Sequence, residues 1–298
     1  MKTFIRTAFI AVAWLCMYGT ACACDICGCS ISNNNPFLFP AASRHFVGFS
    51  WYHRVYDLHL EDGSVAHMRS SNLLLTAQYA IGSRIRLQAV LPYISNQYSS
   101  VTGVETRSGT GDLSVLGTYN LYTKTLGKTK HLITFTLGVK FNTAVATPSV
   151  NPALAVADLQ TGSGSTDFLL AMGYRLTHAN WTAQLQTGYR YNTQDTKSNL
   201  RFGDVATASI NIYRKLPLPS FTFTPYASYN FESRMDDARA HSLVKGSGGT
   251  VSTLGAGLDL STRKLAMGIS CQSPITQTLS NGAIHESLRL NTHIYFTF

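Results

Sequence analysis

Strict alternation of apolar and polar residues, repeated along most of the chain, constrains the fold more than any other feature. The last such segment is SLRLNTHIYFTF, at residues 287–298. One face would carry Leu288, Leu290, Thr292, Ile294, Phe296 and Phe298, and the other Arg289, Asn291, His293, Tyr295 and Thr297. Because successive side chains of a β-strand point to opposite sides, this pattern predicts a strand with one apolar and one polar face.

Twelve segments of this kind follow one another, each long enough to cross a bilayer as a tilted strand of about 9–11 residues. They lie at about 44–58, 68–82, 83–97, 112–124, 131–143, 166–177, 180–194, 204–215, 220–233, 250–261, 264–273 and 286–298. Gaps after even-numbered segments are short, whereas those after odd-numbered segments are mostly longer and rich in Gly, Ser, Asn and Asp. This asymmetry is typical of outer-membrane barrels with both termini in the periplasm. The sequence therefore predicts an all-β fold, a transmembrane antiparallel β-barrel of about 12 strands with periplasmic N- and C-termini.

Composition supports a membrane environment. Charged residues make up 13% of the chain, well below the roughly 25% of soluble domains, and aromatic residues make up 11%. The alternative, a soluble sandwich, would need a polar outside, whereas here the apolar faces end in aromatic residues such as Trp51, Tyr93 and Tyr189. The net charge of +9 does not indicate nucleic acid, since the chain has no Lys/Arg run and no DNA-binding motif.

The N-terminus predicts export. Lys2 and Arg6 flank the start of an apolar run at 7–18, and small residues follow at 21–23. The run is about 12 residues long, and a membrane-spanning helix needs roughly 20, so we favour a cleaved signal peptide over a membrane anchor. A lipoprotein cut before Cys22 is a further alternative. We expect a signal peptide at 1–23, a Cys-rich periplasmic N-terminal segment at 24–43 and one barrel domain at 44–298, located in a bacterial outer membrane.

Four cysteines crowd into CACDICGCS at 22–30, and cleavage before Cys24 leaves Cys24, Cys27 and Cys29 at the new N-terminus. Three thiolates this close can hold a soft ion such as Cu(I), or Zn with a fourth ligand. In an oxidising compartment they can instead form a disulfide with one thiol left over, and a lipid on the first cysteine is a third possibility. The alternation places Cys271 on the apolar face, as a small lipid-facing residue.

Basic side chains dominate the predicted inward face. By alternation this face includes Arg54, Arg84, Arg86, Lys140, Arg175, Arg190, Arg289 and His293, with Asp259 as the clearest acid. Rings of basic side chains favour anions in a pore, so these residues are the candidates to contact a solute. The alternative interpretation is that the arginines pair with acids and fill a narrow barrel.

Several stretches resemble outer-membrane transporters of the meta-pathway phenol-degradation (MetA-type) family. They are LPYIS at 91–95, GTGDLSVLGTYNLY at 109–122, GVKFNT at 138–143, LQTGSGSTDFLLAMGYRL at 159–176 and SPITQTLSNGAIHESLRLNTHIYF at 273–296. The resemblance implies a barrel that passes small molecules. We therefore expect an outer-membrane channel or transporter for a small solute, anionic or aromatic. The chain departs from the family at FNTAVATPS and in its CxxCxC head.

We do not expect an enzyme. The segment TLSNG at 278–282 is similar to the active site of twelve-stranded outer-membrane phospholipases, but Thr278 stands where they have the histidine base. The expected partners are outer-membrane lipid, the barrel assembly machinery and a small solute, with no nucleic acid. The rival hypothesis is a non-conducting protein whose Cys24, Cys27 and Cys29 bind a metal or dock a periplasmic redox partner.

Overall fold

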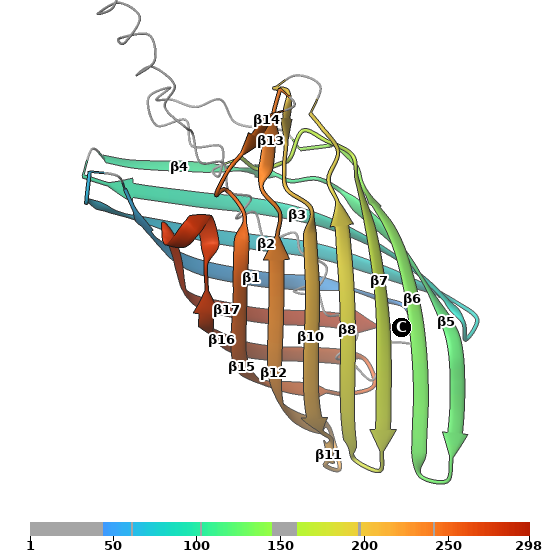
Figure 1. The fold of residues 1–298 in the computed structure, drawn as a ribbon. Coiled ribbons are helices and arrows are strands. Elements are labelled where there is room, and N and C mark those ends of the chain that lie inside the picture. The colour runs from blue at the N-terminus through green and yellow to red at the C-terminus, as the bar shows by residue number, and fades with distance from the viewer. Residues whose placement is uncertain (1–43, 61, 102, 145–159, 196–197, 241) are drawn as a thin grey trace, which may run out of the picture.

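Long antiparallel strands account for most of the computed structural model, which describes residues 44–298 apart from 61, 102, 145–159, 196–197 and 241 (Figure 1). The strands are β1 (Phe46–His59), β2 (Val65–Ile81), β3 (Ile85–Ser100), β4 (Gly103–Thr110), β5 (Ser114–Leu126), β6 (Thr129–Lys140), β7 (Asp167–His178), β8 (Trp181–Tyr191), β9 (Leu200–Arg201), β10 (Val205–Arg214), β11 (Leu216–Pro217), β12 (Thr222–Arg234), β13 (Asp237–Arg239), β14 (Ser242–Val244), β15 (Gly249–Ser261), β16 (Leu265–Gln277) and β17 (Ile284–Thr297). One 3-10 turn, η4 (Leu279–Gly282), precedes β17. In this part of the chain no helix has the length and apolar character needed to cross a membrane.

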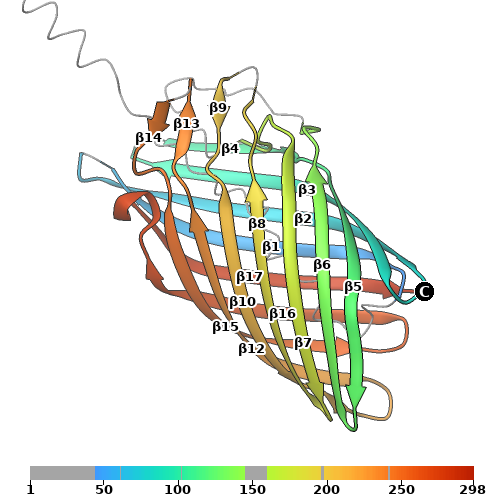
Figure 2. The ribbon, with the colours of Figure 1, turned by 45° about the vertical axis from the view of Figure 1, so that its right-hand side comes forward.

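Twelve of the strands close into a barrel (Figure 2). Each of the long strands pairs with its neighbours in sequence, and the circle is completed by pairing of β1 with β17 and of β10 with β12. Closure leaves no strand edge exposed, which a sheet inside lipid requires because no water is present to satisfy its backbone groups. The prediction of a twelve-stranded antiparallel barrel is confirmed.

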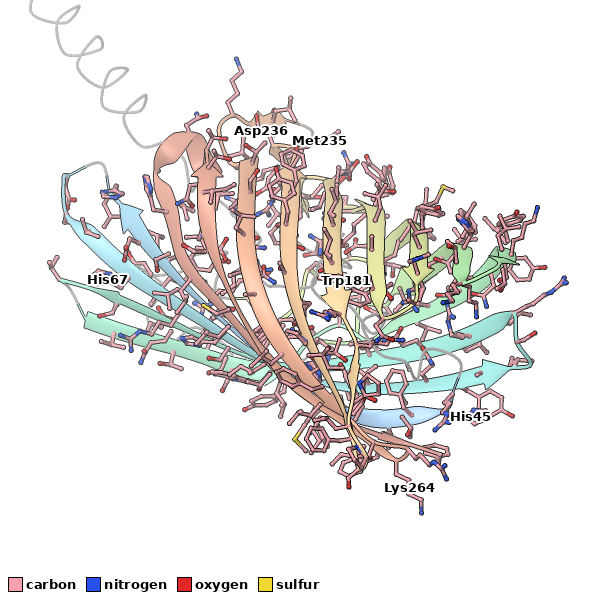
Figure 3. The ribbon with its side chains drawn as sticks, turned by 90° about the horizontal axis from the view of Figure 1, so that it is seen from below. His45, His67, Trp181, Met235, Asp236 and Lys264 are labelled. Carbon is pink, nitrogen blue, oxygen red and sulfur yellow. The ribbon has the colours of Figure 1, made fainter. Side chains whose placement is uncertain are left out.

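The two ends of the barrel differ. Turns at 82–84, 127–128, 179–180 and 262–264, and the connection 215–221 that contains β11, join strands at one end, which we call the turn end. At the other, the loop end, lie the described residues of the connections that follow β1, β6, β8, β12 and β16, most of which are longer than those turns. Phe46 pairs with Thr297, so the two ends of the barrel chain both lie at the turn end. Figure 3 shows Lys264 at the turn end and Met235 and Asp236 at the loop end.

One predicted loop is largely a strand. The sequence suggested a loop at 98–111, but β4 pairs with β3 from Ser100↔Gly103 to Tyr93↔Thr110, so the two form a hairpin that extends the wall at the loop end. The segment continues as β5, which pairs with β3 from Val90↔Ser114 onward. A second small sheet, β14-β13-β9, forms from the connections 192–204 and 235–248 at the same end (Figure 1).

Alternation places the apolar face outward and the polar face inward, as predicted. Large outward hydrophobic side chains are exposed on every barrel strand, among them Phe49, Leu75, Leu87, Val115, Leu137, Leu170, Leu185, Ile210, Tyr229, Leu258, Ile269 and Ile294. Inward positions between them hold buried polar residues, such as Thr118 and Thr136, whose hydroxyls lie 2.9 Å apart. This arrangement is the inverse of a soluble protein and is typical of a barrel surrounded by lipid.

Candidate functional site

The inward face is the candidate site, and its loop half contains a network of buried arginines and acids. Arg289 on β17 donates two hydrogen bonds to Glu286, both of 2.6 Å, and its Nη1 lies 3.8 Å from Glu232 on β12. Arg54 on β1 approaches the same Glu286 at 3.9 Å and donates to the Tyr56 hydroxyl. Buried charges need partners of this kind, because an isolated charge taken out of water is strongly unfavourable. Arg54 and Arg289 are therefore held by acids.

A second network joins the loop end of three strands through Lys140. Its ammonium group forms an ion pair with Asp167 on β7 and lies 3.7 Å from Asp112 in the break between β4 and β5. The Lys140 ammonium also donates to the Ser163 hydroxyl at 2.8 Å. All four side chains are buried. Like the two arginines, Lys140 belongs to a network that neutralises its charge.

His293 meets Asp259 across an intervening strand. Nε2 of His293 on β17 lies 3.3 Å from Oδ1 of Asp259 on β15, and both side chains are nearly fully buried. The residue of β16 that stands opposite both is Gly268. A Cβ there would overlap Asp259 Oδ1 and lie 2.6 Å from His293 Cε1, so the pair requires a glycine at this position.

The turn half of the bore holds Arg86 and Arg175. Arg86 on β3 is buried, and its charge and that of Arg175 on β7 act on each other. Nη2 of Arg175 donates to Gln184 on β8 at 3.2 Å. Both arginines line a small cavity together with Thr134, Gly173 and Gln184. This half of the described bore is poor in acids, with Asp259 alone among the inward positions.

The remaining predicted residues lie elsewhere. Arg190 on β8 is buried in the loop half, where its charge acts on Glu232. Arg84 is not part of the strand wall. It lies exposed in the turn before β3, because β2 ends at Ile81 and β3 begins at Ile85. Extending the alternation from Arg86 back to Arg84 places one residue too many on the inward face. Lys215 follows β10 and is a further cation at the turn end. Burial lowers the pKa of its ammonium group most, and the charges of Arg175 and Lys130 lower this pKa further.

Sequence reasoning missed the inward acids that partner these cations. They are Asp112, Asp167, Glu232 and Glu286, all buried or nearly so and all in the loop half. The signal for two of them was present, since Asp112 and Asp167 end the Gly/Ser-rich stretches GTGD and TGSGSTD. Glu286 was hidden by an irregularity in the pairing between β1 and β17 at Val55/Tyr56, which shifts the alternation by one residue.

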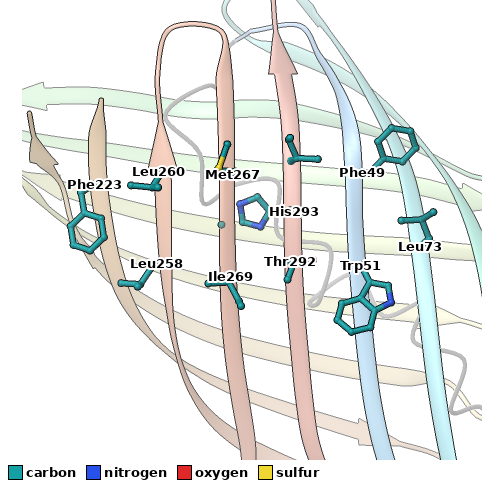
Figure 4. A pocket seen from close by; sticks show the side chains of 12 residues that line it. Phe49, Trp51, Leu73, Phe223, Leu258, Leu260, Met267, Ile269, Thr292 and His293 are labelled. Carbon is teal, nitrogen blue, oxygen red and sulfur yellow. The ribbon is translucent and has the colours of Figure 1, made fainter. Parts of the chain in front are cut away.

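An apolar groove of about 600 Å³ lies on the outer wall over β16 (Figure 4). Its lining comes mostly from outward residues of neighbouring strands, such as Trp51, Leu258 and Ile269, and also includes Gly268 and His293. The groove is thus part of the lipid-facing surface.

The cysteine head and the hydrolase-like segment are the remaining candidates that the sequence raised. Cys24, Cys27 and Cys29 lie outside the described residues, so the choice between a Cu(I) or Zn site and a disulfide stays a prediction. Cys271 is free and exposed on the outer wall. Ser280 is buried in η4, and the Thr278 hydroxyl lies 3.0 Å from that of Thr250. Over residues 44–298, with the gaps named above, no cluster of three or more His, Cys, Asp or Glu side chains is arranged to hold a metal.

A closed antiparallel barrel with an apolar outer belt and a polar inner face is the architecture of bacterial outer-membrane proteins. The protein is an outer-membrane β-barrel. It belongs to the family described as "Putative MetA-pathway of phenol degradation", whose sequence profile matches residues 63–272. The family resemblance predicted from the sequence is confirmed.

Solved structures share this architecture. An outer membrane channel from Pseudomonas putida F1 superposes with a TM-score of 0.64 at 15% identity, covering 87% of this chain and 99% of that one. The β domain of the Bordetella autotransporter BrkA superposes with a TM-score of 0.51 at 12% identity, covering 85% of this chain and 100% of that one. No curated protein sequence matches the chain. At these identities the likeness concerns the fold.

Proposed function

We propose that the protein is an outer-membrane channel that passes a small solute along its bore, with the turn end facing the periplasm. The observation that supports this most directly is the polar inward face of a closed barrel whose outer face is apolar. A polar inward face is what a water-filled bore that conducts a polar solute requires. The similar structure from Pseudomonas putida F1 is itself named an outer membrane channel.

The charges of the bore favour Arg86 and Arg175 as the residues that contact the solute. In the loop half, Arg54, Lys140 and Arg289 are neutralised by acids at 2.6–3.9 Å, and Lys140 also by its ion pair with Asp167. In the turn half, the two arginines line one cavity and their charges repel each other. A ring of net positive charge inside a pore lowers the energy of anions and raises that of cations. The proposed solute class is therefore small anions.

The test is ion selectivity in planar bilayers under a salt gradient. The wild-type channel should prefer anions, and an Arg86→Glu/Arg175→Glu variant should shift the permeability ratio several-fold toward cations. Arg69→Glu is the matched control, because Arg69 carries the same charge but is exposed on the outer face of β2. Absence of any conductance in the wild-type protein would contradict the channel itself. Conductance with the same selectivity in all three proteins would contradict only the role of the two arginines.

A further inference from the structure

The turn end of the barrel carries a strong excess of positive charge. Its described segments 44–45, 82–84, 124–131, 176–181, 214–221, 261–265 and 296–298 contain no Asp or Glu. They carry nine cations, which are Arg44, Arg84, Lys124, Lys128, Lys130, Arg214, Lys215, Arg263 and Lys264. All described acids other than Asp259 lie toward the loop end. A surface of one sign attracts oppositely charged ligands and raises their local concentration.

Within this end lies a pocket of about 340 Å³ at the mouth of the bore. Two arginines line it, Arg44 before β1 and Arg263 in the turn between β15 and β16. Hydroxyl groups of Ser220 and Ser261 lie in the same lining, and Phe221 adds an apolar wall. None of the residues that line the pocket is an Asp or Glu. The pocket thus offers donors and positive charge on one side and apolar surface on the other.

A hydrogen bond joins the side chain of Arg44 to the turn that carries Arg263. Nη1 of Arg44 donates to the backbone oxygen of Arg263 at 2.8 Å, and the Thr297 hydroxyl donates to the same oxygen at 2.8 Å. The turn itself is ordered by Thr262, whose hydroxyl accepts from the backbone N–H of Leu265 at 3.0 Å. The pocket lining thus has two cations and no Asp or Glu, so an oxyanion bound there would meet positive charge without a competing carboxylate.

We propose that this pocket binds the carboxylate or phosphate group of a small organic anion, whose apolar part rests on Phe221 and Leu218. Arginine suits this role because its planar donors match both oxyanions. The inference rests on the proposed channel function, and it deepens that function by placing a binding step for the conducted solute at the turn-end mouth. The site is separate from the Arg86 and Arg175 cavity, which is lined by other residues.

The experiment uses the full barrel in nanodiscs of zwitterionic lipid and follows binding of 4-fluorobenzoate by ligand-observed fluorine NMR. Arg44→Gln/Arg263→Gln should weaken binding about tenfold or more, because two charge-assisted contacts are lost. Lys128→Gln/Lys264→Gln is the matched control, since it removes the same charge from the same end without touching the pocket lining. We expect it to change the affinity by about twofold at most, as exposed charges are screened by salt. The neutral isostere 4-fluorobenzamide should not bind.

A second arm separates a solute site from a lipid site, because a phospholipid headgroup carries the same phosphate chemistry. Binding that is unchanged in nanodiscs containing phosphatidylglycerol supports the solute site. Loss of 4-fluorobenzoate binding on adding that lipid would reassign the pocket to headgroups and overturn the proposal, as would equal binding by the Arg44/Arg263 variant. Conductance is recorded separately. A conducting barrel without arginine-dependent binding contradicts the pocket alone, whereas binding without conductance contradicts the proposed channel.

Discussion

At the scale of single residues, a missing side chain is as important as those present. Asp259 and His293 lie on strands that are not neighbours, and their 3.3 Å contact passes over Gly268 on the strand between them. Burial makes the contact matter, because an unpaired buried carboxylate or imidazole loses its hydration without compensation. The glycine thus enables a polar contact in the turn half of the bore.

We expect Gly268→Ala to destabilise the barrel by about 1–3 kcal/mol, the usual penalty for forcing atoms into a packed site. The added methyl group would overlap Asp259 Oδ1 and push the imidazole of His293 away. Gly117→Ala on β5 is the matched control, because the nearest atom to its new Cβ lies 3.7 Å away. Free energies of unfolding measured by denaturant titration in micelles give the comparison. Equal stability of the two variants would show that the pair does not depend on the glycine.

At the scale of elements, the loop end is tied together by one carboxylate in a strand break. Asp112 lies between β4 and β5, and its oxygens accept hydrogen bonds from the backbone N–H groups of Thr143, Ala144 and Ser163. The donors at 143–144 follow β6, and Ser163 precedes β7. A single side chain therefore fixes both ends of the connection between two strands, in the way that Asp commonly caps backbone donors in turns.

Removing this carboxylate should loosen the connection while leaving the barrel closed. In Asp112→Ala we expect hydrogen exchange at the amides of Thr143, Ala144 and Ser163 to become at least about tenfold faster, since each loses its acceptor. Amides in the middle of β6 and β7 should keep their protection. Asp195→Ala is the control, because the Asp195 carboxylate accepts from the backbone N–H and the hydroxyl of the exposed Ser198. Unchanged exchange at the three amides would show that the loop is held by other contacts.

At the scale of the whole molecule, the fold was readable from the sequence and the internal charge network was not. Alternation of apolar and polar residues identifies strands because every second side chain of a strand points to the same face, as in SLRLNTHIYFTF. The lengths of the connections between the predicted strands distinguish the two ends of the barrel. Ion pairs such as Arg289 with Glu232 join strands that are distant in sequence, so no local pattern reveals them. Arg44 and Arg263 are likewise brought together only by closure of β1 on β17.

The lipid-facing belt predicts how the cost of a charge depends on its position along the barrel. Leu137 lies outward within β6, away from its turn end, and is 56% exposed, whereas Leu126, 53% exposed, ends β5 at the turn end. An arginine at the bilayer midplane of a barrel costs about 2–4 kcal/mol, and one near the interface costs about 0–1 kcal/mol. We therefore expect Leu137→Arg to destabilise the barrel folded in lipid vesicles far more than Leu126→Arg does. The measurement is reversible folding in liposomes followed by tryptophan fluorescence. Equal losses would mean that the two leucines occupy the same environment, which an apolar belt with polar ends does not allow.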